Sequence, residues 1–290
     1  MANAKGKRRK KKSRLKEVLR QLRKNKLAVA GAVVIILLVL VAIFAPILAP
    51  YPYDVQDLTA TYIHPCAAHP FGTDNLGRDI LSRIIYGTRQ SLRIGVLSVA
   101  IAAVLGIIFG SIAGFYGGQV DNILMRFLDI YQSIPAMLLS IALAAALGPG
   151  INNAILAIGI STMSTYARMI RAQILTVRDR EFVEAAQAIN ASDARIIVKH
   201  ILPNSFAPLI VAITMNIGNS ILAAATLSFI GLGAQPPLPE WGAMLSGGRA
   251  YMRDHGYLVM IPGIFIMISV LAFNLLGDGL RDALDPRMKN

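Results

Sequence analysis

The sequence is poor in charged residues and in cysteine. Only 16% of its 290 residues are charged and 55% are hydrophobic, whereas a soluble domain carries about 25% charged residues. Its single cysteine, Cys66, excludes an internal disulfide. The chain has no G-x-x-x-x-G-K-[ST] phosphate loop, and no paired carboxylates or nucleophile–base arrangement can be identified. These absences argue against a soluble domain, against ATP binding in the usual way and against a catalytic site.

Positive charge is concentrated at the N-terminus. The formal net charge is +13, and 13 of the 29 Lys and Arg residues precede residue 27. No aromatic residue lies among them, so a base would have no surface on which to stack, and nucleic acid is not an expected partner. Residues 1–26 are instead predicted to form a basic cytoplasmic tail that sets the membrane topology and can contact anionic lipid headgroups.

Long uncharged runs predict an all-α integral membrane protein with six transmembrane helices. A helix needs about 20 apolar residues to cross the hydrocarbon layer. The runs are Leu27–Leu48, Ile94–Tyr116, Ile130–Ala167, Ser205–Leu232 and Tyr257–Gly277. The third run has 38 residues, and the turn sequence GPGINN at 148–153 divides it into two helices. The first run is too long for a cleavable signal, so it is expected to stay as a membrane anchor.

These spans predict how the chain is organised. The expected segments are a first transmembrane helix at 27–49, an extracellular loop at 50–93, a five-helix core at 94–277 and a cytoplasmic C-terminus at 278–290. Of the 29 Lys and Arg residues, 23 fall on the side of the N-terminus, so both termini are predicted to be cytoplasmic. The third span reaches full length only from about Asn122, and we expect Arg126 and Asp129 to form an ion pair at its cytoplasmic end.

The predicted cytoplasmic loop at 168–204 is long and amphipathic. A first helix is expected from Asp179, with an apolar face made of Phe182, Val183, Ala186 and Ile189. Asn190 interrupts this helix, Asp193 lies at the start of a second short helix, and Pro203 is expected to end it. The helix–turn–helix leaves an apolar face that either the membrane helices or a partner protein must cover.

The second half of this loop resembles the EAA loop of ABC importer permeases. That signature has E-A-A, three residues, Gly, and a Leu-Pro pair about a dozen residues later, and EAAQAINASDARIIVKHILP at 184–203 follows it except that Asn190 holds the Gly position. Asn is the non-Gly residue that best tolerates a left-handed turn. The resemblance implies a type I importer fold, in which this loop docks into a cleft on an ATPase subunit. It assigns the coupling role to Glu184, Ala185, Ala186, Asn190, Ala191, Asp193, Leu202 and Pro203.

Two further stretches resemble one group of these permeases, the dipeptide, oligopeptide and nickel group. HPFGTDNLGRDILSRIIYGTRQSLRIG at 69–95 is similar to the segment before the second span, and NLLGDGLRDALDPR at 274–287 is similar to the C-terminus. The resemblance implies the second permease of a heteromeric pair in a bacterial cytoplasmic membrane. It favours import of di- or oligopeptides, with nickel or another small solute as the alternative.

The same resemblance implies the partners. They are a second permease, one or two ABC ATPase subunits that bind ATP and Mg, and an extracellular solute-binding protein. No cofactor is expected in this chain. The rival class is a free-standing secondary transporter or channel, which would usually carry an ionisable residue near the membrane midplane. Apart from Arg126 and Asp129, the predicted spans hold none.

Polar residues within the fifth predicted span are candidates for the translocation path. They are Thr214, Asn216, Asn219 and Ser220. Polar groups at this depth face a bundle interior or a cavity, so they either bond neighbouring helices or line the path. On the second span, Gly106, Gly110 and Gly114 repeat at the spacing of close helix packing, against a helix of this chain or of the second permease.

Two clusters lie in the predicted extracellular loop. The first consists of Gly72, Thr73, Asp74, Gly77, Arg78 and Asp79. It is either a structural loop or, as the resemblance implies, a surface that faces the solute-binding protein. The second is His64, Cys66 and His69, whose side chains could bind nickel or zinc. Its prolines and exposed setting favour a plain linker, so no metal site is predicted.

Overall fold

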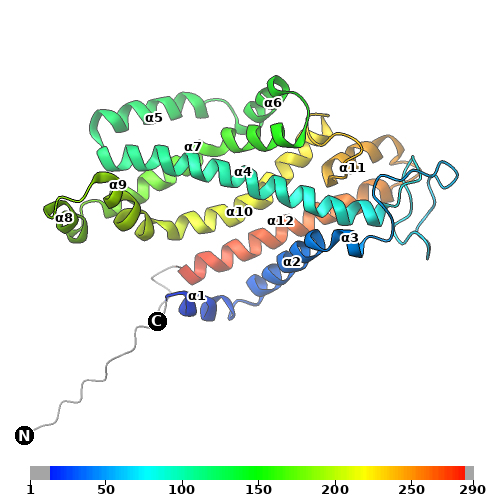
Figure 1. The fold of residues 1–290 in the computed structure, drawn as a ribbon, viewed down its shortest axis with the longest axis horizontal. Helices are drawn as coiled ribbons and strands as arrows, with labels where there is room; N and C mark the ends of the chain where they lie inside the picture. Colours follow the sequence, from blue (N-terminus) through cyan, green and yellow to red (C-terminus); the bar gives the residue numbers. More distant parts are fainter. Residues whose placement is uncertain (1–13, 285–290) are drawn as a thin grey trace, which may run out of the picture.

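The computed structural model describes residues 14–284, with side chains from residue 18, and shows an elongated bundle of helices (Figure 1). No β-strand occurs between residues 14 and 284, and the all-α fold class is confirmed. The helices are α1 (Arg14–Leu22), α2 (Lys26–Ile43), α3 (Ala45–Leu48), α4 (Ile80–Tyr116), α5 (Gly118–Gln132), α6 (Ala136–Leu147), α7 (Ile151–Val177), α8 (Glu181–Ala188), α9 (Asp193–Ile196), the π-helix η1 (Ile197–Ile201), α10 (Leu202–Phe229), α11 (Trp241–Gly248), the 3-10 helix η2 (Arg249–Tyr251) and α12 (Tyr257–Leu284).

Four helices in residues 14–284 are long and apolar enough to cross a membrane. They are α2, α4, α12 and the continuous helix Asp193–Phe229, which joins α9, η1 and α10. The pair α5 and α6 would make a fifth. Helix α7 has sufficient length but carries polar residues such as Ser161 and Ser164, which are buried against its neighbours. The predicted count of six transmembrane helices therefore stays a prediction, whereas the multi-pass character is supported.

The third predicted span is broken rather than straight. We expected one helix from about Asn122, but α5 and α6 are bent by 82° where they meet. Pro135 lies at this break and precedes the first residue of α6. Proline disfavours a helical conformation in the residue before it, so α5 ends at Gln132. The turn at 148–150, by contrast, separates α6 from α7 as the sequence predicted.

Several helices extend beyond the predicted spans. Residues 80–93 were expected in a loop, but they form the first turns of α4. Asp79 caps this helix, because its carboxylate accepts a hydrogen bond from the backbone N–H of Ser82 at 2.7 Å. With 37 residues, α4 is about 55 Å long, whereas the hydrocarbon layer is about 30 Å thick. It is therefore longer than the hydrocarbon layer is thick.

The two ends of the bundle carry different elements. Figure 1 shows α8 and α9 at one end, and α11 with the loop before α4 at the opposite end. Helix α1 and the C-terminal end of α12 lie in the half of the bundle nearer α8. We call the end with α8 the coupling end and the other the outer end.

The glycine repeat of α4 packs against α7 of the same chain. A Cβ atom added to Gly106 would meet the backbone N of Ala167 at 2.8 Å, and one added to Gly110 would collide with the carbonyl oxygen of Ala167. A Cβ at Gly114 would lie 3.0 Å from Ile174 Cβ. The two backbones approach so closely that only glycine fits between them. The sequence allowed a packing partner in this chain or in the second permease, and the structure shows α7 of this chain in that position.

We expect Gly110→Val to destabilise the protein, because the added side chain meets backbone that cannot move aside. Overpacking of this kind costs about 1–3 kcal/mol or more. Ala100→Val is the matched control, since Ala100 lies on the same helix but is exposed. Thermal unfolding can be followed by the fluorescence of Trp241, the single tryptophan, which is fully buried. Equal unfolding temperatures for the two variants would contradict the packing described.

Candidate functional site

The predicted coupling loop is a helix, a left-handed turn and a second helix. Helix α8 ends in a Schellman motif, in which the N–H of Asn190 donates to Gln187 O at 2.8 Å and the N–H of Ala191 donates to Ala186 O at 3.1 Å. Asn190 has a φ of 57°, so it adopts the left-handed conformation that the sequence predicted. The turn is thus closed by the loop's own backbone.

One face of α8 is packed into the bundle. Val183 is fully buried and Ala186 is 5% exposed, in a core shared with Ile174 of α7 and Ile201 of η1. Val183 and Ala186 confirm half of the predicted apolar face. Because Ala186 points inward, it joins the loop to the bundle. Leu202 is buried in the same core.

The other half of the predicted face is on the surface. Phe182 and Ile189 were expected to lie with Val183, but they are 38% and 80% exposed. Helix α8 has only eight residues and packs against α9 and η1, which leave the side with Phe182 and Ile189 uncovered. Val198 of η1 is also exposed. Among the residues of the sequence match, Glu184, Ala185, Asn190, Asp193 and Pro203 are exposed, and Ala191 is half-buried.

Pro203 does not end the second helix, contrary to the prediction. The chain passes from α9 through η1 into α10 without a break. Pro203 lies in the first turn of α10, directly after the π-helical turn Ile197–Ile201. Proline has no N–H to donate, so one backbone hydrogen bond is missing at this point, yet the helix continues. The loop therefore continues directly into a long membrane helix.

Polar contacts connect the loop to α4 and α5. Tyr116 Oη donates to Asp193 Oδ2 at 3.1 Å, and Arg178 Nη1 donates to the carbonyl oxygen of Gly114 at 3.1 Å. Arg171 of α7 pairs with Asp121 at the start of α5. These contacts fix the coupling end of α7, from which α8 follows.

The predicted ion pair between Arg126 and Asp129 is absent from the described residues. Asp129 pairs instead with Arg168 of α7, with 2.9 Å between Oδ1 and Nη2. Helix α7 lies beside α5 and brings Arg168 within reach, which helical spacing within α5 could not reveal.

The polar residues of α10 occupy different positions. Asn219 is exposed, and its Nδ2 donates to Asn216 Oδ1 at 3.2 Å. Thr214 Oγ1 donates to Ile210 O of its own helix, and Ser220 is buried. On the same side of α10 as Asn219, a cavity of about 650 Å³ lies against α11 and α12; it is lined mostly by apolar side chains, with Thr226 and Asn274 as polar members.

At the outer end, most of the glycine-rich cluster is a self-supporting loop. Thr73 and Asp79 are 0% and 3% exposed, so neither faces a partner. Thr73 Oγ1 donates to Ala60 O at 2.6 Å, and Asp79 accepts hydrogen bonds from both the N–H and the hydroxyl of Ser82. Gly72 and Gly77 have φ values of 80° and 69°, as tight turns require.

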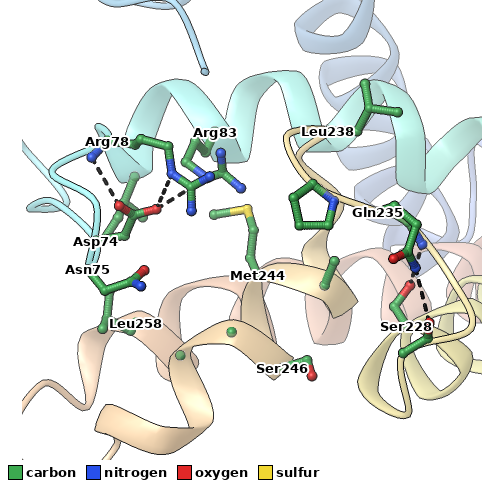
Figure 2. A pocket seen from close by; sticks show the side chains of 17 residues that line it. Asp74, Asn75, Arg78, Arg83, Ser228, Gln235, Leu238, Met244, Ser246 and Leu258 are labelled. Atoms are coloured by element: carbon green, nitrogen blue, oxygen red, sulfur yellow. Dashed lines mark hydrogen bonds and ion pairs between the residues drawn. The ribbon is translucent and has the colours of Figure 1, made fainter. Parts of the chain in front are cut away.

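Asp74 and Arg78 of this cluster border a pocket of about 250 Å³, shown in Figure 2. Arg78 Nε donates to Asp74 Oδ2 at 2.7 Å, and Arg83 Nε lies 3.7 Å from the same oxygen. Arg83, which the sequence analysis did not single out, is 6% exposed and reaches across to the loop before α11, where its Nη1 lies 3.5 Å from Pro237 O.

The fully buried Glu240 is another residue that sequence reasoning missed. Its Oε1 accepts from the N–H of Gly242 at 2.9 Å and from Ser91 Oγ at 3.2 Å, and its Oε2 accepts from the N–H of Ala243 at 2.9 Å. Glu240 thereby caps α11 and fixes it to α4. In the sequence, the only indication of this capping role is an acidic residue directly before the first residue of α11, Trp241.

The histidine–cysteine cluster does not come together as a metal site. His69 Nδ1 lies 2.9 Å from Asp79 Oδ1, and Cys66 is exposed. Between residues 14 and 284, no group of three or more His, Cys, Asp or Glu side chains could hold a metal ion.

Two family models and several named relatives match the sequence of this chain. The family described as "Binding-protein-dependent transport system inner membrane component" matches residues 106–290, and "N-terminal TM domain of oligopeptide transport permease C" matches residues 13–65. A dipeptide transport system permease protein of Alkalihalophilus pseudofirmus is 46% identical over 95% of this chain and 90% of its own. A probable D,D-dipeptide transport system permease protein of Escherichia coli is 48% identical over 92% of this chain and 89% of its own.

Solved structures share the fold. A chain of the MetNI methionine ABC transporter in an inward-facing conformation has a TM-score of 0.57 and 19% identity, over 71% of this chain and 98% of that one. An amino acid ABC transporter gives a TM-score of 0.52 and 15% identity, over 70% of this chain and 94% of that one. At such identities the likeness concerns the fold alone.

The family models and the named relatives, by contrast, show the family. The chain belongs to the family of binding-protein-dependent transport system inner membrane components, as a multi-pass permease of the dipeptide and oligopeptide type.

Proposed function

We propose that this chain is one of two permease subunits of an ABC importer that carries di- or oligopeptides across a bacterial cytoplasmic membrane. One observation carries the proposal: the loop at the coupling end is fixed to the bundle on one side and exposes Phe182 and Ile189 on the other. Exposed apolar side chains on a rigid support are the usual anchors of a protein interface. The relatives named for dipeptides support the choice of substrate.

The exposed side of α8 docks on an ATPase subunit, which binds the ATP and Mg. Because α8 shares its core with α7 and η1, a displacement of the docked loop displaces both helices. The membrane helices of the importer then change between inward- and outward-facing arrangements as the ATPase subunit hydrolyses ATP. The coupling end is cytoplasmic in this proposal, and both chain termini are on that side, next to anionic lipid.

The second permease and an external solute-binding protein complete the transporter. Asn216 and Asn219 line the path between the two permeases, since they offer hydrogen-bonding groups on an exposed face of α10. The solute-binding protein contacts the outer end, where Asp74 and Arg78 are the accessible members of the glycine-rich cluster.

Transport by the purified complex tests the function. The chain is reconstituted in liposomes with its partner subunits, and uptake of a radiolabelled dipeptide is measured with the solute-binding protein present. We expect uptake that needs ATP and stops when the ATPase is inactivated. Uptake that proceeds without ATP and follows an ion gradient would instead identify a secondary transporter.

We expect Ile189→Glu to weaken docking of the ATPase, because it replaces the most exposed apolar side chain of α8 with a charge. Co-purification in detergent should fall about tenfold or more. Glu184→Lys tests the neighbouring exposed position. Lys24→Gln is the control, since it causes the same change in net charge as Ile189→Glu at an exposed site before α2. Full recovery of the ATPase with Ile189→Glu would rule out this surface as the docking site.

The left-handed turn gives a second test of coupling. Asn190→Gly should preserve transport, because glycine adopts a φ of 57° without strain. Asn190→Val should destabilise the turn by about 1–2 kcal/mol, because a β-branched residue is strained there. The measured quantity is peptide-stimulated ATP hydrolysis per complex. If the valine variant retains the activity of the glycine variant, the turn is not required for coupling.

A further inference from the structure

The pocket at the outer end holds an excess of positive charge. Two guanidinium groups, those of Arg78 and Arg83, face the one carboxylate of Asp74. The oxygens of that carboxylate are already engaged: Oδ1 accepts from the N–H groups of Leu76 and Arg78, and Oδ2 accepts from Arg78 Nε. One of the two cationic charges therefore has no carboxylate of its own within the pocket.

The other acidic groups near the pocket have partners of their own or form no ion pair with its arginines, although the charge of Asp54 still acts on Arg83. Asp79 pairs with His69 and caps α4, and Glu240 caps α11. Asp54 is exposed and forms no ion pair within 4.0 Å in the part of the chain that the structure describes. None of these carboxylates occupies the space in front of Arg78.

The side chain of Arg78 lines the pocket and has N–H groups without a protein partner in the described residues. Only the Nε of the Arg78 side chain is hydrogen-bonded to protein within residues 14–284, so both Nη atoms are available to a ligand. The side chain is nevertheless only 11% exposed, which gives it a fixed position and a partly dehydrated setting. A planar guanidinium so placed suits bidentate binding of a carboxylate.

The remaining walls suit the end of a short peptide. Figure 2 shows Gln235 and Ser228 on the side of the pocket opposite Asp74, Arg78 and Arg83. Gln235 Nε2 donates to the carbonyl oxygens of Gly231 and Gly233, which leaves its Oε1 as an acceptor for a main-chain N–H. Gly247 also lines the pocket, and a Cβ added there would meet nothing within 4 Å, so there is open space beside this residue.

We propose that this pocket binds the C-terminal carboxylate of a short peptide at the outer face, before the peptide enters the path. Arg78 holds the carboxylate, Arg83 supplies a second positive charge, and Gln235 accepts from the last peptide N–H. A volume of about 250 Å³ admits the end of a peptide rather than a folded partner. This assignment rests on the peptide-import function proposed above and adds a substrate site to it.

Binding of trialanine and of trialanine amide tests the site. The probes are added to the complete permease–ATPase complex in nanodiscs without the solute-binding protein, and affinities are measured by saturation-transfer NMR of their methyl groups. We expect trialanine to bind about tenfold or more tightly than its amide, because only the acid makes the charged contact. Arg78→Gln should abolish that preference. Gly247→Leu, which fills the open space without altering the arginines, should weaken binding of both probes.

Arg253→Gln is the matched control, because it removes an exposed positive charge from the loop between η2 and α12, outside the pocket. Equal affinities for the acid and the amide in the wild type, or an Arg253→Gln effect as large as that of Arg78→Gln, would overturn the assignment. So would a loss of solute-binding-protein affinity in Arg78→Gln with no preference for the acid, since the pocket would then bind an acidic side chain of that protein. Uptake of dipeptide by the same complex, reconstituted in liposomes with the solute-binding protein, separates the two proposals. Its absence counts against peptide import, whereas uptake with equal probe affinities counts against the pocket alone.

Discussion

Backbone contact between α4 and α7 determines where the other elements of this permease can lie. Three glycines, Gly106, Gly110 and Gly114, allow α7 to pack so closely that any side chain on them would strike its backbone or its Cβ atoms. On another part of α7, the hydroxyl of Ser161 forms a 2.6 Å hydrogen bond with the hydroxyl of Ser140 of α6. In a membrane, such close packing replaces the hydrophobic driving force that lipid does not supply.

The same helix pair connects the two ends of the molecule. Helix α4 begins beside the outer pocket, to which it contributes Arg83, and ends at Tyr116, which bonds Asp193 of the coupling loop. Helix α7 leads into α8, whose inner face is part of the core of α4, α7 and α10. A displacement at α8 therefore has a continuous, closely packed route toward the outer end.

Local features of the sequence predicted a large part of this arrangement. The helix–turn–helix of the coupling loop, the left-handed Asn190 and the break at 148–150 depend on neighbouring residues, and all three are present. Features that depend on distant packing were not predictable. Phe182 and Ile189 have the same spacing as buried residues, but the packing of α8 against α9 and η1 decides which side of α8 is covered.

Contacts between residues far apart in the sequence could not be predicted either. Asp129 pairs with Arg168, 39 residues away, in place of Arg126. Arg83 approaches Pro237, 154 residues away, so the outer pocket exists only once α4 and the loop before α11 have come together. Pro203 continues a helix because a π-helical turn precedes it, and no propensity of single residues predicts such a turn.

The central claim is that the coupling loop and the α4–α7 pair move as one body. Two spin labels measure this directly, one on Gln187→Cys in the loop and one on Val104→Cys on α4, with Cys66→Ser removing the native thiol. Gln187 and Val104 are both exposed, and Gln187 is not one of the two docking residues Phe182 and Ile189. The distance between the labels is compared in the full transporter without nucleotide and with trapped ATP. The account predicts a distance unchanged within about 2 Å, the size of small adjustments between packed helices. A change well beyond that would show that the loop moves independently of α4, and would contradict the account.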